Sequence, residues 1–206
     1  MRYYLIAAST LFMLGSSCPD DSKRKLPEYD MIRDSIRIEP RDNAGIVDLL
    51  EVHSYQTTFI KDRLSSSQTD NVLEVISAAK IHKYDVYDLL AIAFKESSFH
   101  SDIISDTGDV GLFQVNYYWW GKKLGYKNFK EFYQGNIDPK KNTKHAIDIL
   151  RIFSSSPRCK GNNLFACYNG GRGWKKSKNV LNITRYREGV VKTRNRIKRS
   201  YPEWAK

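Results

Sequence analysis

The chain has 206 residues, of which 41% are hydrophobic and 13% aromatic, and its formal net charge is +11. This length suits one domain with appendages or two small domains, and the aromatic content excludes a disordered chain. Residues 172–206 hold twelve basic residues against two acidic ones, a net charge of +10. Such a segment predicts an anionic partner, but charge alone does not choose between nucleic acid, an anionic membrane and an acidic wall polymer.

The N-terminal segment "MRYYLIAASTLFMLGSSC" has the features of an export signal. Arg2 is followed by twelve mainly apolar residues and then by small residues before Cys18. This stretch is too short to span a bilayer and is typical of a signal peptide, so we expect residues 1–18 to direct export to the cell envelope, the periplasm. The end of the segment resembles a bacterial lipoprotein signal, which makes Cys18 a lipidation candidate. An ordinary secretory signal is the alternative.

Residues 19–70 are predicted to form a tether and an N-terminal helical extension. Residues 19–30 are polar and contain proline, whereas the apolar residues between 42 and 64 allow one loosely periodic helix. The stretch "SSSQTDN" is expected to break that helix, with Thr69 or Asp70 capping the next one. We therefore place the main domain, with its basic C-terminal helix, at residues 71–206.

Helical periodicity dominates this domain. One helix is expected to end near His82, and Asp85 is placed to cap the next, whose apolar positions are Val86, Leu89, Leu90, Ala93 and Phe94. Further helices are expected at residues 142–153, at residues 164–169 before two glycines, and at residues 186–200 as a basic amphipathic helix. Few alternating runs are long enough for strands, so the fold class is mainly α.

Glu96 lies at the border of this apolar stripe, where a carboxylate is partly desolvated. Desolvation raises a carboxyl pKa, as a general acid for a glycosidic oxygen requires. A solvated surface glutamate is the alternative. The loop that follows favours a site, because Gly108 and Gly111 permit close backbone approach and Gln114 offers a donor and an acceptor for sugar groups. The four aromatic residues 117–120 are either sugar platforms or core.

The order of motifs resembles the soluble lytic transglycosylase domain, a lysozyme-like helical fold. The stretch "ESSFHSDIISDTGDVGLFQV" is similar to the family's Glu-Ser and Gly-Leu-Met-Gln signature, and "NIDPKKNTKHAIDIL" and "FACYNGG" follow in the family's order. The resemblance spans roughly residues 71–198. It departs from the family pattern at four positions, which are Ser101, Ile103, Phe113 and Cys167.

This resemblance implies an enzyme that cleaves the MurNAc–GlcNAc β-1,4 bond of peptidoglycan and leaves a 1,6-anhydro-MurNAc end. Glu96 would be the single catalytic acid/base, and Ser97 would hold the sugar or the surroundings of Glu96. The implied substrate-binding residues are Leu112, Phe113, Gln114, Tyr168, Asn169 and Tyr186. No cofactor and no metal is implied, and no ligand spacing connects His53, His82, His100 and His145.

Two other functions remain open. A hydrolytic muramidase of the same fold would position water with Asp102, Asp106 or Asp109, although goose-type lysozymes carry an aspartate where this chain has Asn116. A non-catalytic peptidoglycan-binding protein would keep the groove without needing the acid. The basic C-terminal segment is expected to meet an anionic wall polymer or a membrane surface, and we do not expect nucleic acid as a partner.

The remaining cysteines, Cys159 and Cys167, are separated by eight positions. In an oxidising compartment they could close a short loop as a disulfide. Two reduced thiols are the alternative, because the sequence does not give the distance between their Cα atoms.

Overall fold

The computed structural model describes residues 64–205. The expected signal peptide with Cys18, the tether and residues 42–63 of the first expected helix lie outside the described residues. The described part is mostly helical, which confirms the predicted fold class. Its helices are α2 (Ser66–His82), α3 (Val86–Ser97), α4 (Phe129–Asn136), α5 (Pro139–Ser154), α6 (Asn163–Gly170) and α7 (Val180–Ser200).

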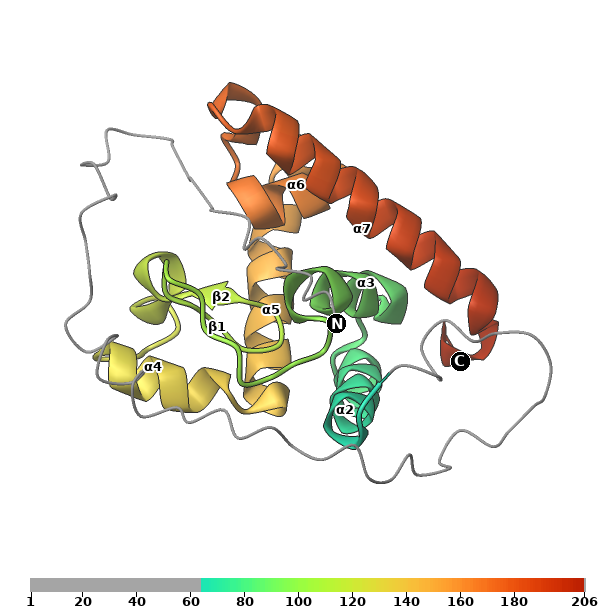
Figure 1. The fold of residues 1–206 in the computed structure, drawn as a ribbon. Coiled ribbons are helices and arrows are strands. Elements are labelled where there is room, and N and C mark those ends of the chain that lie inside the picture. Colours follow the sequence, from blue (N-terminus) through green and yellow to red (C-terminus); the bar gives the residue numbers. More distant parts are fainter. Residues whose placement is uncertain (1–63, 206) are drawn as a thin grey trace, which may run out of the picture.

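Helix α3 forms the centre of the molecule (Figure 1). The side chain of Asp85 accepts hydrogen bonds from the backbone N–H groups of Tyr87 and Asp88, so it caps the helix as predicted. From Leu89 to Ala93 the helix is buried on all sides. Helix α2 packs against one side of α3 and the long helix α7 crosses the other, so α3 presents its C-terminal end inside the fold.

Helix α2 begins earlier than the sequence pattern predicted. Its N-cap is Ser65, whose hydroxyl accepts from the backbone N–H of Gln68, while the Gln68 side chain accepts from the backbone N–H of Ser65. This reciprocal pair is a capping box, and it turns a polar stretch that looked like a helix break into a first helical turn. Capping by Thr69 or Asp70 was therefore wrong. The helix ends at His82 as expected, with Lys83 in the left-handed conformation.

The C-terminal helices agree with the sequence pattern, with small differences at their ends. Helix α5 starts three residues earlier than predicted because Asp138 caps it and Pro139 occupies its first position. Helix α6 ends before Gly171, which has a φ of +70°. Helix α7 starts six residues earlier than predicted and ends at Ser200. The short helix α4 was not predicted.

A small antiparallel hairpin lies beside the helices. Strands β1 (Asp109–Val110) and β2 (Val115–Asn116) pair so that Asp109 faces Asn116 and Val110 faces Val115. A single π-helical turn, Tyr117–Gly121, follows β2. The loop between its strands is held close to the core helix, because the hydroxyl of Ser97 at the end of α3 donates to the carbonyl of Leu112.

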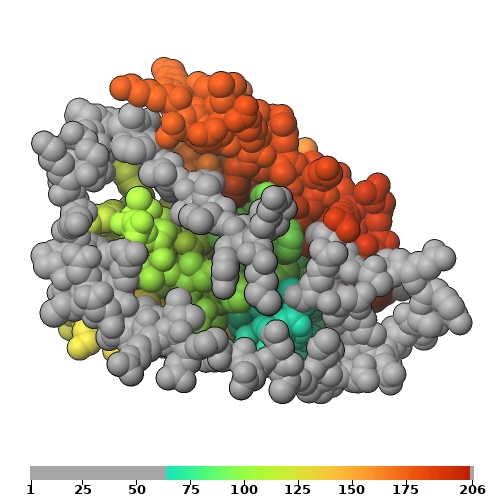
Figure 2. All heavy atoms as spheres, in the orientation of Figure 1, coloured from blue at the N-terminus to red at the C-terminus, as the bar shows by residue number. Residues whose placement is uncertain are grey.

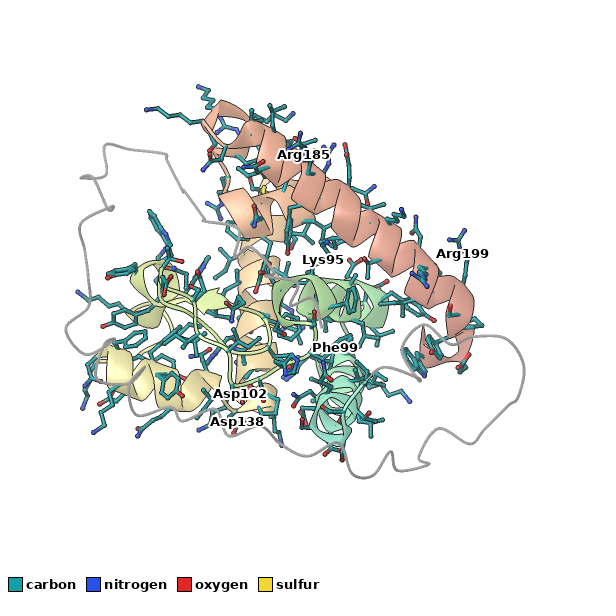
Figure 3. All side chains as sticks on the ribbon, in the orientation of Figure 1. Lys95, Phe99, Asp102, Asp138, Arg185 and Arg199 are labelled. Atoms are coloured by element: carbon teal, nitrogen blue, oxygen red, sulfur yellow. A yellow bond between two sulfur atoms is a disulfide. The ribbon has the colours of Figure 1, made fainter. Side chains whose placement is uncertain are left out.

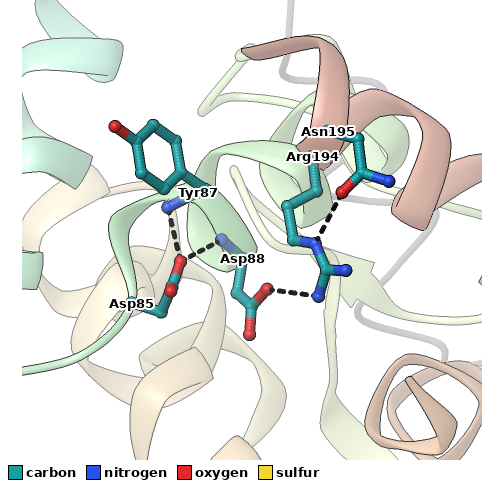
Figure 4. Close-up of polar contacts among 5 residues, drawn as sticks. All are labelled: Asp85, Tyr87, Asp88, Arg194 and Asn195. Carbon is teal, nitrogen blue, oxygen red and sulfur yellow. Dashed lines mark hydrogen bonds and ion pairs between the residues drawn. The ribbon is translucent and has the colours of Figure 1, made fainter. Parts of the chain in front are cut away.

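Polar contacts fix α7 and the chain end against α3. Figure 4 shows the carboxylate of Asp88 on α3 meeting the guanidinium of Arg194 on α7, at 3.3 Å. The hydroxyl of Tyr87 donates to the backbone carbonyls of Tyr201 and Pro202. Within residues 64–205, no helix is both long and apolar enough to cross a membrane.

Candidate active site

The side chain of Glu96, on the last turn of α3, lies against α7. The hydroxyl of Tyr186 on α7 donates a hydrogen bond to Oε1 of Glu96 at 2.5 Å, and Tyr186 is itself buried. No other described residue makes a hydrogen bond to this carboxyl group. Two helices that are far apart in sequence therefore meet at one carboxyl group.

Burial raises the pKa of Glu96 from its ordinary value of 4.5 to about 8. The hydrogen bond from Tyr186 lowers this pKa, the negative charge of Asp109 raises it, and Lys95 lowers it. Burial outweighs the other effects, so the carboxyl group is mostly protonated near neutral pH. A protonated carboxyl in a partly open position can donate a proton to a leaving oxygen.

The carboxylate of Asp109, at the start of β1, is held in a buried polar cluster. Its Oδ2 accepts hydrogen bonds from the hydroxyls of Ser105 at 2.6 Å and Thr107 at 2.5 Å, and its Oδ1 accepts from the Asn116 amide at 2.8 Å. Of the three aspartates that sequence reasoning considered as a second carboxylate, Asp109 is the one whose charge acts on Glu96. Asp102 and Asp106 are exposed.

The turn directly after Glu96 has an unusual backbone. Ser98 and Phe99 have positive φ angles of 51° and 67°, which residues with a Cβ rarely adopt. Side-chain amides of α2 bond to this turn: Gln68 donates to the Ser98 carbonyl at 2.7 Å and Asn71 to the Phe99 carbonyl at 2.8 Å. Sequence reasoning missed these two residues, which hold the C-terminal end of α3 in place.

The loop between the strands is anchored by three side chains. The hydroxyl of Ser97 donates to the Leu112 carbonyl at 2.8 Å, and that of Tyr168 donates to the Phe113 carbonyl at 2.8 Å. The Asn142 carbonyl oxygen accepts from the Phe113 backbone N–H at 2.7 Å. The side chains of Leu112 and Phe113 are fully buried. The Ser97 hydroxyl therefore links the end of α3 to this loop, and both roles expected of Ser97 stay predictions.

Gln114 has a φ of +48° and is only partly buried. Its Nε2 donates to the backbone carbonyls of Gly111 at 2.9 Å and Ile103 at 3.2 Å. Its Oε1 makes no hydrogen bond with any residue from 64 to 205. The amide nitrogen of Gln114 thus closes the loop. Gly111 is required here, since a Cβ at that position would lie 2.0 Å from the Asn136 carbonyl oxygen.

Helix α6 supplies Tyr168 and Asn169. Tyr168 is buried and lies near Glu96, and burial first and the Glu96 charge second raise its pKa far above the ordinary tyrosine value. Asn169 is 6% exposed, and its side chain has no hydrogen-bond partner among the described residues. Because no fully buried polar atom lacks a partner in the described part, the Asn169 amide reaches solvent.

A disulfide holds α6 in position. Cys159 and Cys167 are bonded, with their Cα atoms 5.8 Å apart, and both are buried. The bond links the 3₁₀ turn Pro157–Cys159 to the middle of α6, one residue before Tyr168. Oxidation of this pair therefore fixes the helix that carries two predicted site residues.

The aromatic residues 117–120 divide between core and surface. Trp120 is buried and packs edge-on against Phe153, while Tyr117 packs against Phe129 and Phe132. Tyr118 is 41% exposed and Trp119 is partly exposed. Tyr117 is partly exposed as well, so Tyr118 is the one ring of the four that is exposed in the way a sugar platform requires.

Lys95, next to Glu96, lies between α3 and α7 in Figure 3. Its side chain runs over Gly189 of α7, where a Cβ would come within 3.2 Å of the lysine Cε. Sequence reasoning gave no role to this cation. Among residues 64–205, no group of His, Cys, Asp and Glu side chains is arranged to hold a metal ion.

A family model described as the transglycosylase SLT domain matches residues 74–187 of the chain. The match contains all eight predicted catalytic and substrate-binding residues, from Glu96 to Tyr186, as well as Asp109 and Asn142. No curated protein and no solved structure matches the chain.

Proposed function

The chain belongs to the transglycosylase SLT domain family, and from this premise we propose that it cleaves the MurNAc–GlcNAc β-1,4 bond of peptidoglycan as a lytic transglycosylase. Glu96 is the catalytic acid and then base, and the product carries a 1,6-anhydro-MurNAc end. The observation that carries the proposal is the burial of Glu96, which holds its pKa near 8 beside the Tyr186 hydroxyl.

Glu96 is suited to act in both steps of this reaction. In the first step, the protonated carboxyl donates its proton to the leaving glycosidic oxygen while the neighbouring N-acetyl group assists at the anomeric carbon. The Tyr186 hydroxyl then stabilises the carboxylate that remains, because it donates to the charged form. In the second step, this carboxylate removes the proton of the sugar 6-hydroxyl, which closes the anhydro ring. The reaction consumes no water molecule, and Glu96 is protonated again at its end.

The substrate is expected to lie across Gln114 and Asn169. The Gln114 amide oxygen is an acceptor for a sugar hydroxyl or an acetamido N–H, and the Asn169 amide offers both a donor and an acceptor. Peptidoglycan lies outside the cytoplasmic membrane, so the proposal includes export to the cell envelope, in agreement with the expectation from residues 1–18. Lipidation of Cys18 is part of the same proposal.

A second candidate function rests on Asp109. A hydrolytic muramidase needs a second carboxylate beside the acid, and the charge of Asp109 acts on Glu96. The variant Asp109→Asn distinguishes a transglycosylase from a muramidase by its pH profile and its product. A transglycosylase loses the negative charge that raises the pKa of Glu96, so its alkaline pH limit moves down but its product is unchanged. A muramidase that depends on Asp109 loses turnover at every pH, and Asp106→Asn is the matched exposed control.

Lysis and binding together test whether the protein is an enzyme at all. Wild type and Glu96→Gln are added to a suspension of purified peptidoglycan, whose turbidity is followed and whose sediment is assayed for bound protein. We expect wild type to clear the suspension and the variant to bind without clearing it. Equal binding with no clearing by wild type would leave the non-catalytic binding protein as the better account.

A further inference from the structure

We propose that the outer face of α7 is a docking surface for a linear polyanion, other than a nucleic acid, that carries repeated phosphate groups. Four exposed cations form this surface, here named the basic strip: Arg185, Lys192, Arg196 and Arg199. Their spacing of seven, four and three residues places them on one side of the helix. At 1.5 Å per residue the strip is about 21 Å long, and Figure 3 shows Arg185 and Arg199 near opposite ends of α7.

Three cations of α7 outside the basic strip make contacts within the fold. Arg187 lies over the ring of Trp174, Arg194 over Phe165 and Lys198 over Tyr87, with ring-centroid distances of 5.6, 5.5 and 5.9 Å. Arg194 also pairs with Asp88. By contrast, Arg185, Lys192 and Arg199 form no salt bridge with any residue from 64 to 205. Arg185, Lys192 and Arg199, three of the four cations of the basic strip, are therefore distinct from the charges that stabilise the helix packing.

The strip keeps its positive charge despite one acid on the same side of the helix. Glu188 is exposed, and its carboxylate lies 3.5 Å from the guanidinium of Arg187 on the flank. Three further lysines, Lys175, Lys176 and Lys178, are exposed directly before α7 and extend the positive surface. Figure 2 shows the orange and red atoms of this region along one edge of the molecule.

The geometry favours a polymer over a bilayer. A helix that binds in a membrane interface must offer an apolar face to the lipid. The apolar face of α7 is buried in the core through Ile183, Tyr186, Val190 and Ile197, and Leu181 is the one large apolar side chain exposed on this helix. Cations spread along about 21 Å suit a chain of repeated anions better than a single small anion, which would contact one or two of them.

Docking on this strip leaves the catalytic side free, because Tyr186 points from α7 toward Glu96 while the strip points outward. The strip can therefore retain the protein on an anionic polymer during turnover. Binding at the strip does not depend on the proposed reaction, so it is measured without any wall substrate.

The test is binding of the full chain to fluorescently labelled long-chain inorganic polyphosphate over a series of salt concentrations. The strip variant changes Arg185, Lys192, Arg196 and Arg199 to Gln. The matched control changes four exposed lysines elsewhere to Gln, at Lys130, Lys140, Lys141 and Lys160, so both variants lose the same charge. For a flexible polyanion each cation contributes about 0.7 to the slope of log affinity against log salt.

We expect the strip variant to bind polyphosphate at least about tenfold more weakly than wild type near 0.1 M salt. Its slope of log affinity against log salt should be smaller by about 3, and the control should change far less in both quantities. Equal losses in both variants would show a general charge effect and overturn the proposal. No binding by wild type would overturn it too. Tighter binding to phosphatidylglycerol vesicles or to duplex DNA than to polyphosphate, with the same dependence on the strip, would assign the surface to a membrane or to nucleic acid instead.

Discussion

The hydroxyl of Tyr186 on α7 donates a hydrogen bond to Oε1 of Glu96 on α3, and no other described side chain bonds to this carboxyl group. Two effects at this contact change the pKa of Glu96 in opposite directions. Burial raises the pKa of Glu96 to about 8, whereas the bond from Tyr186 stabilises the charged form and lowers that pKa. Tyr186 therefore limits how strongly the site holds the proton, which matters because the acid must release it during the reaction.

Replacing Tyr186 by Phe is predicted to shift the pH dependence of catalysis. Without the donated hydrogen bond the pKa of Glu96 rises further. The alkaline limit of activity, which reports loss of the protonated acid, then moves to higher pH, while turnover falls because the carboxyl group loses its orientation. The measurement is a pH profile of peptidoglycan lysis. Tyr133→Phe on α4 is the control, and an unshifted limit in Tyr186→Phe would contradict the assigned contact.

Glu96→Gln is predicted to stabilise the protein at alkaline pH. Glu96 has a higher pKa folded than unfolded, so it favours the folded state fully below about pH 4.5, and this contribution is lost as pH rises to about 8. The variant does not ionise. Its free energy of unfolding should therefore match wild type at pH 4 and exceed it by on the order of a few kcal/mol at pH 9.

Urea unfolding at both pH values measures this difference. Glu74→Gln, on the partly exposed surface of α2, serves as the control and should show no such pH-dependent gain. A Glu96→Gln variant that is less stable than wild type at pH 9 would contradict the raised pKa of this partly buried side chain.

Asn71→Ala is predicted to weaken both the fold and the site. The change leaves the Phe99 carbonyl without its buried donor, which costs about 1–3 kcal/mol of stability. It also loosens the left-handed turn that follows Glu96, so turnover should fall while binding of peptidoglycan changes less. Asn195→Ala, on the exposed face of α7, provides the comparison. An equal effect of both changes on turnover would remove the positioning role of Asn71.

Loss of the disulfide is predicted to destabilise the protein by about 2–3 kcal/mol, as expected for the short loop that it closes. The comparison is the thermal unfolding of wild type with and without dithiothreitol, beside the double Cys159→Ser, Cys167→Ser variant. The variant should match reduced wild type and be insensitive to the reductant. If dithiothreitol does not change the unfolding midpoint of wild type, and this midpoint equals that of the variant, then the bond does not form.

Local patterns predicted the helices best. The apolar stripe of α3 and the cap at Asp85 follow from adjacent residues, as do the two glycines that end α6, so a sequence pattern can show them. Helix α2 was misjudged at its start because serines and Gln68 suggested a break, although the same residues make a capping box. Helix α4 was missed because its eight residues show too little periodicity, although Asn128 caps it by accepting from Glu131 N–H.

The site residues also fall into two groups, those that a local sequence pattern reveals and those whose contacts depend on tertiary packing. Glu96 could be proposed from its place at the edge of the stripe, but the buried cluster around Asp109 and the amide contacts of Asn71 and Asn142 depend on tertiary packing. Asn142 is 29 positions from the backbone group that it anchors, so no local pattern reveals the contact. The family signature supplied Tyr186, while its bond to Glu96, 90 positions away, required the structure.

The most direct test of the central claim is the mass of the muropeptides that the protein releases from purified peptidoglycan. Wild type is compared with Glu96→Gln, and the products are separated and weighed by mass spectrometry. The proposal predicts products that lack one water relative to hydrolysis, with no reducing end, and no release by the variant. Products of full hydrolytic mass from wild type would contradict the transglycosylase and make Asp109 the next residue to test.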